Sequence, residues 1–205
     1  MQHLAIRLTT AVAGAALACV VGAPGISYAD NRPATAGTKT AQAAPNASAA
    51  RSLPDGWRRC NNPYYRYSIG YPRHWYTTQI RRSEVCRQFD RQPFTIPPYS
   101  EYPMTALNAV PTTMTVRAYV RGATQPEFAV TLLKQNTWVC GRHAVRFETV
   151  STGEGLYPKG TRTYGYAINR NGTAFVVFTM TPPGDSLYAR NKVVVDRAVR
   201  TLRFR

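Results

Sequence analysis

The residues best suited to catalysis in this 205-residue chain are few and far apart. After the first thirty residues there are two histidines, His74 and His143, and three cysteines, Cys60, Cys86 and Cys140. A nucleophilic triad needs a histidine beside a serine or cysteine and a carboxylate. Cys140 and His143 are the one close pair, but an i, i+3 spacing on a strand points them to opposite faces. The spacing therefore argues against cysteine catalysis and against a metal held by this pair.

Metal-binding patterns are also missing from the sequence. It contains no His-x-x-x-His, no Cys-x-x-Cys and no cluster of acidic residues, and such groupings supply the ligands of most zinc and calcium sites. We therefore expect no metal and no cofactor. Two histidines are still able to act as general acid and base. A nuclease or other hydrolase that uses His74 or His143 thus stays open as an alternative function.

Arginine is the abundant residue that is suited to bind a ligand. The chain has 26 Lys plus Arg against 10 Asp plus Glu, a formal net charge of +16, and its 44% hydrophobic content excludes an expanded disordered chain. Between residues 51 and 91 the arginines alternate with tyrosine and tryptophan. Arginine beside aromatic rings contacts phosphates and stacks on bases or sugars, although a solvated arginine surface over an aromatic core has the same pattern. The candidate binding residues are Arg58, Arg59, Arg73, Arg81 and Arg82.

The first 29 residues have the pattern of a secretory signal peptide. After a basic start, an apolar run from residue 11 to 21 is too short to span a membrane, and small residues mark a cleavage site after Ala29. Lipid attachment at Cys19 is the less favoured alternative, because Ala16 stands where that motif has leucine. We therefore expect a secreted protein that does not meet genomic DNA or messenger RNA. Its anionic partners would be envelope components, such as lipid head groups and wall polymers.

The rest of the chain divides into a linker and one domain. Residues 30–51 are mostly small and polar, which predicts a flexible tether, and residues 52–205 are long enough for a single domain with its own core. Outside the cytosol, two of the three remaining cysteines should pair. We predict a Cys60–Cys86 disulfide, with Cys140 left as a lone buried thiol. The pairing Cys60–Cys140 is also allowed by the sequence.

Hydrophobic periodicity predicts that this domain is mostly strands. The clearest signal is Asn171-Gly172, a hairpin turn between two β-rich runs, the second of which is apolar enough for a central strand. The predicted strands are residues 64–71 (half-buried), 75–80, 112–120, 138–150, the two arms of 162–181, and 202–205. The predicted helices are residues 126–134 and a second one from Asp185 or Ser186 to about Leu202. This set of elements indicates an α+β domain.

The start of the domain carries a family resemblance. Residues 62–75, Asn-Pro-Tyr-Tyr-Arg-Tyr-Ser-Ile-Gly-Tyr-Pro-Arg-His-Trp, resemble the opening of PsbP-like domains, and residues 140–145, Cys-Gly-Arg-His-Ala-Val, resemble their middle strand. The ending is similar too: an apolar strand, a tyrosine-bearing helix and a short final strand. The resemblance covers about residues 55–205 and implies an antiparallel sheet flanked by helices, an α/β/α sandwich with its C-terminal helix on the sheet, usually without catalytic activity. The chain departs from the family in its many arginines and three cysteines, so no partner is carried over.

These observations together predict a secreted, non-enzymatic binding or structural domain of the cell envelope. It would contact an anionic envelope component or an envelope protein through an arginine-rich face, including contact at a membrane surface. The sequence indicates no oligomeric state. The charge is concentrated in residues 51–91 and 186–205, so the prediction depends on whether these two segments form one face.

Overall fold

The computed structural model describes residues 52–79, 81–96 and 104–205. The predicted signal peptide with its cleavage after Ala29, the alternative lipid attachment at Cys19 and the tether of residues 30–51 lie outside the described residues. Among the helices in the described ranges, none is long and apolar enough to cross a membrane.

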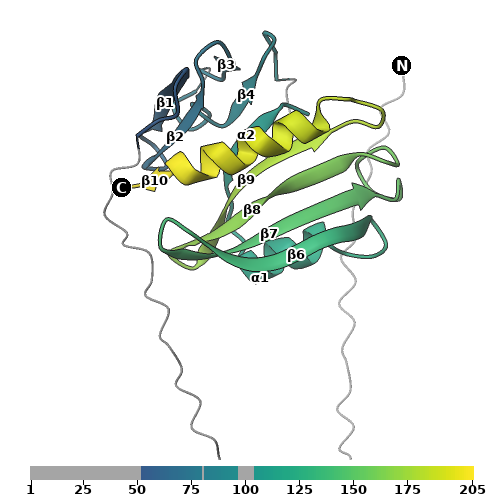
Figure 1. The fold of residues 1–205 in the computed structure, drawn as a ribbon. Helices are drawn as coiled ribbons and strands as arrows, with labels where there is room; N and C mark the ends of the chain where they lie inside the picture. The colour runs from purple at the N-terminus through teal and green to yellow at the C-terminus, as the bar shows by residue number, and fades with distance from the viewer. Residues whose placement is uncertain (1–51, 80, 97–103) are drawn as a thin grey trace, which may run out of the picture. The chain divides into compact units, whose positions relative to one another are not determined.

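Seven antiparallel strands form the larger of two sheets (Figure 1). In spatial order they are β3 (Tyr76–Thr77), β4 (Gln88–Asp90), β5 (Leu107–Pro111), β9 (Thr173–Thr181), β8 (Arg162–Arg170), β7 (Arg142–Ser151) and β6 (Ala129–Val139). β9 lies between β5 and β8 and is buried from Ala174 to Thr181. The prediction of a central strand there is therefore confirmed.

The smaller sheet joins the two ends of the domain. It has the order β1 (Trp57–Asn62), β2 (Tyr67–Pro72), β10 (Arg203–Phe204), with both neighbours antiparallel to β2. The short final strand predicted at residues 202–205 is thus present. Because β10 pairs with β2, the last residues of the chain lie beside the first strands of the domain.

The two helices, α1 (Val116–Ala123) and α2 (Tyr188–Thr201), cover opposite faces of the larger sheet (Figure 1). Successive side chains of a strand point to opposite faces, and on β9 Phe175 packs in the cluster that contains α2, whereas Val176 packs in the cluster that contains α1. The α+β class, the α/β/α order and the C-terminal helix packed on the sheet are therefore confirmed.

The Asn-Gly hairpin is also confirmed. Asn171 and Gly172 connect β8 to β9 with φ values of 53° and 90°. A two-residue hairpin turn of this kind needs positive φ at both positions, which asparagine and glycine adopt at low cost. The local sequence alone was sufficient to place this turn.

The predicted strand at residues 112–120 is wrong, because the segment contains α1. Thr115 caps this helix, its hydroxyl accepting a hydrogen bond from the main-chain nitrogen of Ala118 (3.2 Å). The buried residues, Val116 and Val120, are four apart. That spacing is compatible with both a strand and a helix, so periodicity favoured the wrong element.

The predicted helix at residues 126–134 is wrong as well, because most of that segment belongs to the edge strand β6. The register of β6 with β7 shifts between Thr131 and Leu133, so Leu132 is the extra residue of a bulge. The extra residue interrupts the two-residue alternation of apolar side chains, so two leucines, Leu132 and Leu133, follow each other in the sequence. The interrupted pattern resembled helical spacing.

The segment predicted as one strand at residues 138–150 is the end of one strand and most of the next. Cys140 and Gly141, with φ values of 51° and 72°, form the turn between β6 and β7. The predicted shared face of Val145, Phe147 and Thr149 is confirmed, since these alternate residues are buried on the side of the sheet that α1 covers. The strand predicted at residues 75–80 is reduced to β3, and β1, β4 and β5 were not predicted.

β2 is covered on both faces, not half-buried as predicted. Tyr67 and Ile69 face the core, while Gly70 lies against the last turn of α2 and donates from its main-chain nitrogen to the hydroxyl of Thr201 (2.7 Å). A Cβ at Gly70 would lie only 2.8 Å from that hydroxyl oxygen. The glycine therefore allows α2 to seal the outer face of this strand.

Cys60 and Cys86 form a disulfide, as predicted. Disulfides are typical of proteins outside the reducing cytosol. Cys140 is exposed, so the prediction that its thiol is buried is wrong. Its place in a surface turn, not inside a strand, explains the difference.

Candidate functional site

The structure does not bring the two histidines together. His74 is exposed in the turn before β3, and His143 is exposed on β7, where its ring lies edge-on to Trp138 with 6.2 Å between centroids. β3 and β7 are separated by four strands in the larger sheet, about 24 Å at the usual strand spacing. Within the described residues, no three His, Cys, Asp or Glu side chains are grouped to hold a metal.

The five arginines predicted to bind an anion do not share one face. Arg58 and Arg59 are adjacent on β1 and point to opposite sides: Arg58 donates to the carbonyl of Trp75 (3.0 Å), and Arg59 to the carbonyl of Thr201 (2.9 Å). The remaining three are exposed in turn segments; they are Arg73, Arg81 and Arg82. Of the five, Arg59 alone reaches the group of cations described next.

Six arginines gather where β10 joins β2, and we call them the arginine cluster. They are Arg59 and Arg66 from the β1–β2 hairpin, Arg142 at the start of β7, Arg170 at the end of β8, and Arg203 and Arg205 at the end of the chain. Arg66, Arg203 and Arg205 are exposed, and the other three are partly buried. The two charged segments identified in the sequence therefore do meet, at this end of the domain.

Phe204 organises one half of the arginine cluster. The guanidinium carbons of Arg142 and Arg170 lie 5.1 and 5.3 Å from the centre of its ring. The ring itself packs edge-on against Phe175 in the core, with 5.2 Å between centroids. Arginine stacked on an aromatic face is positioned with little loss of its hydrogen-bonding capacity. The core thus holds two cations in place through one phenylalanine.

Backbone pairing positions the other half. The main-chain nitrogen of Arg205 donates to the carbonyl of Arg66 (2.9 Å), and the Arg205 guanidinium donates to Oδ1 of Asn61 (3.3 Å). Arg203 pairs with Ser68 in the β10–β2 register, and Arg59 donates to the same serine hydroxyl (3.2 Å). The cluster is therefore built by the pairing of the chain's last strand with the first hairpin.

Like charges in the cluster affect one another. Burial, followed by the charges of Arg203 and Arg205, lowers the pKa of Arg59 from its ordinary value. Burial, followed by the charges of Arg142 and Arg66, lowers the pKa of Arg170 in the same way. The neighbouring arginines thus add to the larger effect of burial, because each protonated guanidinium raises the cost of its neighbours' charge. An arriving anion would relieve this repulsion.

The segments that carry the arginine cluster contain no carboxylate side chain. Residues 57–72, 138–147, 162–172 and 197–205 include no aspartate or glutamate. Acidic side chains are used instead between α2 and the sheet, where Glu148 pairs with Lys192 (2.6 Å) and Arg162 (3.5 Å). The cations at the β10 end are thus concentrated without intervening acids from their own strands.

The sequence analysis missed Arg142 and Arg170, because both lie between the two charge-rich segments, residues 51–91 and 186–205, and belong to neither. One signal was present: each arginine flanks a two-residue turn, Cys140-Gly141 and Asn171-Gly172. In a meander of antiparallel strands, alternate turns lie at the same end of the sheet. Recognising both hairpins would have placed these two arginines together.

Comparisons with known proteins found similarity in fold but not in sequence. No protein-family profile and no curated protein sequence matches the chain. The solution structure of cyanobacterial PsbP (CyanoP) from Synechocystis is similar with a TM-score of 0.45 and 11% identity, covering 73% of this chain and 93% of that one. A crystal structure from Bacteroides thetaiotaomicron is similar with a TM-score of 0.38 and 12% identity, covering 72% of this chain and 48% of that one. No family, ligand or partner is inferred from these two similarities.

Proposed function

We propose that this protein is a secreted, non-enzymatic binding domain of the cell envelope, and that the arginine cluster contacts a phosphate-bearing envelope component. The observation that carries the proposal is the convergence of six arginines from segments that contain no acidic side chain. Like charges at close range destabilise a fold unless they are screened or matched. A cluster of this kind is therefore better accounted for by an external anion than by stability.

The chemistry of the cluster favours phosphate. The guanidinium group presents a planar fork of donors that matches phosphate oxygens, and it keeps its charge at any physiological pH. Arg66, Arg203 and Arg205 are exposed, so they are accessible to a large polymer or a membrane surface. Arg59 is engaged with the end of α2 through the Thr201 carbonyl, and its role in this proposal is to add charge, not direct contact.

The test is binding to vesicles of phosphatidylglycerol and phosphatidylcholine, with a variant pair matched in charge. The double variant Arg203→Gln/Arg205→Gln removes two exposed arginines of the cluster, and Arg81→Gln/Arg82→Gln removes two exposed arginines elsewhere. Each arginine near an anionic surface contributes about 1 kcal/mol, so the first variant should bind about 30-fold more weakly. The second should bind nearly as well as the original chain, and binding should weaken as salt rises.

Equal losses in the two variants would show that only net charge matters and would refute a localised site. Salt-independent binding would refute the electrostatic basis of the proposal. Zwitterionic phosphatidylcholine vesicles without phosphatidylglycerol serve as the blank, because they carry no net charge.

A further inference from the structure

The face of the larger sheet that α1 covers contains a cavity of about 480 Å³. The eight residues of α1 extend about 12 Å, whereas the ten residues of β7 extend about 33 Å. The helix is therefore too short to cover this face. The space beside it is bordered by Phe128 and by the loop after β7 at Gly155, Leu156 and Tyr157, and it is open to solvent on one side.

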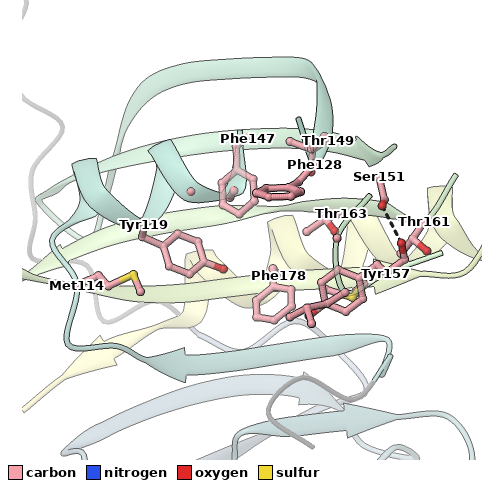
Figure 2. Close-up of a pocket in the computed structure, with 16 residues that line it drawn as sticks. Met114, Tyr119, Phe128, Phe147, Thr149, Ser151, Tyr157, Thr161, Thr163 and Phe178 are labelled. Carbon is pink, nitrogen blue, oxygen red and sulfur yellow. Dashed lines mark hydrogen bonds between the residues drawn. The ribbon is translucent and has the colours of Figure 1, made fainter. Parts of the chain in front are cut away.

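Apolar groups dominate the lining of this cavity. Figure 2 shows the rings of Tyr119, Phe128, Phe147 and Phe178 around the space, with α1 on one side and the sheet on the other. None of the sixteen lining residues is charged, in a chain whose formal net charge is +16. Small-molecule sites are typically cavities of this size, mostly apolar, with a few polar groups that orient the ligand.

The polar groups gather where β7 and β8 meet the covering loop. Thr149 pairs with Thr163 in the sheet register, and the main-chain nitrogen of Ser151 donates to the carbonyl of Thr161 (2.8 Å). The hydroxyl of Ser151 is engaged with the chain itself, since it donates to the carbonyl of Tyr157 (3.0 Å) (Figure 2). The cavity is thus apolar through most of its lining and hydroxyl-bearing at one end.

Thr161 provides a second, independent sign of a ligand. It lines the cavity and is only 2% exposed, and its hydroxyl oxygen has no hydrogen-bond partner. A buried hydroxyl without a partner is costly and rare in folded proteins. Because this oxygen has almost no accessible surface, a ligand oxygen in the cavity would reach it after rotation of the Thr161 side chain, and the new hydrogen bond would remove that cost.

The mouth of the cavity is apolar as well. Leu156 is 91% exposed and Met114 is 55% exposed, and both belong to the lining. Exposed apolar side chains that border a pocket are typical of binding sites. Without a basic or acidic residue among those that line it, the site has nothing to compensate a charged group taken out of water.

We propose that this cavity, the α1 pocket, binds an uncharged lipid-like molecule whose hydrocarbon body packs on the aromatic rings and whose single neutral oxygen hydrogen-bonds to Thr161. The pocket and the arginine cluster are separate features, so either proposal stands if the other fails. The ligand class follows from the absence of charge in the lining, the size of the cavity and the unpartnered hydroxyl.

The probe for the test is diphenylhexatriene, a pure hydrocarbon that fluoresces in apolar surroundings, and the competitors are ten-carbon chains with different heads. Decanol should displace the probe from the full chain, whereas decanoate and decyltrimethylammonium should displace it at least tenfold less well. A charged competitor as effective as decanol would overturn the proposed ligand class.

Gly122 offers a variant that fills the pocket without strain. It lines the cavity on α1, and a Cβ added there meets no atom within 4 Å. Gly122→Leu should weaken probe binding at least tenfold and yet raise the melting temperature, because leucine favours a helix more than glycine does. The matched control is Ala189→Leu, at an exposed position of α2, which should bind the probe like the original chain.

Thr161→Val separates the polar contact from the apolar one. It should weaken decanol binding by roughly two- to tenfold, the range for one neutral hydrogen bond, while leaving the affinity for the hydrocarbon probe unchanged. Unchanged decanol binding in Thr161→Val, or unchanged probe binding in Gly122→Leu, would refute the site. If the original chain excludes the probe and is a dimer that Gly122→Leu dissociates, the face belongs to a second copy and the proposal is wrong.

Discussion

Gly165 is the position at which the fold should be least tolerant of one added methyl group. It lies on β8 opposite Phe178 of β9, in the middle of the larger sheet. A Cβ at Gly165 would lie 2.5 Å from the Cβ of Phe178 and 2.6 Å from the carbonyl oxygen of Val177. Carbon atoms pack best at about 3.5–4.0 Å, so β9 would have to move by about 1 Å.

The expected loss of stability in Gly165→Ala is about 3 kcal/mol. Overpacking of a core costs about 1–3 kcal/mol, and the upper end applies because two of the three nearest atoms, the Val177 carbonyl oxygen and the Phe178 Cα, belong to the backbone of a paired strand. A domain of this size should lose roughly 6–12 °C in melting temperature for such a change. Phe178 also lines the α1 pocket, so the displaced strand should weaken binding there too.

The assay is urea unfolding of Gly165→Ala and of Gly122→Ala, with tryptophan fluorescence as the readout. The same substitution should have opposite effects, because a Cβ at Gly122 meets nothing and alanine is favoured in a helix by about 0.5–1 kcal/mol. Gly165→Ala within about 1 kcal/mol of the original chain would refute the close approach of β8 and β9. A similar loss in both variants would refute the assignment of Gly122 to an uncrowded helix position.

Three further predictions concern covalent, acid and salt effects. Cys60→Ser/Cys86→Ser opens a loop of 26 residues and should lower the free energy of unfolding by about 3.5 kcal/mol in the loop-entropy estimate, whereas Cys140→Ser should change it little; equal urea midpoints for the two variants would contradict this. Burial of Glu148 acts to raise its pKa, but hydrogen bonds from Lys192 and Tyr188, with the charges of Lys192 and Arg162, outweigh burial and hold its pKa below the ordinary 4.5. Its stabilising effect is therefore complete above pH 4.5 and lost as pH falls through the lower folded value, so unfolding curves of Glu148→Gln and the original chain should converge in acid; a gap that widens instead would reverse the sign. Added sodium chloride should raise the melting temperature by screening the arginine cluster. This rise should be smaller in Arg203→Gln than in the original chain. If Arg81→Gln reduces the rise by as much as Arg203→Gln does, the repulsion lies elsewhere.

Elements with strong local signals were predictable. The Asn171-Gly172 turn, the apolar strand after it and the C-terminal helix each depend on residues that are neighbours in the chain. The helix bounds differ by only a few residues from the prediction, with α2 running from Tyr188 to Thr201. Local conformational preferences and tertiary packing favour the same structure in these segments, so the sequence is sufficient to predict them.

Elements that depend on distant partners were not predictable. β6 is a strand because its backbone pairs with β7, and its bulge at Leu132 hides the alternation that would have revealed it. α1 contains valines at positions that fit either period, so only its packing on the sheet decides between helix and strand. Periodicity reports which residues are buried only when one regular element produces the pattern.

The candidate sites show the same division. The sequence alone determined the excess of positive charge, the antiparallel α+β class and the lack of a catalytic motif. It favoured the Cys60–Cys86 disulfide without excluding Cys60–Cys140. Only the tertiary structure decided that Arg66, Arg142, Arg170 and Arg205 share one end of the domain, and that Thr161 lies unpartnered beside an apolar cavity. The physical reason is that both features combine side chains that are far apart in the chain. Strand pairing brings the arginines together, and a helix shorter than its sheet leaves the cavity beside Thr161.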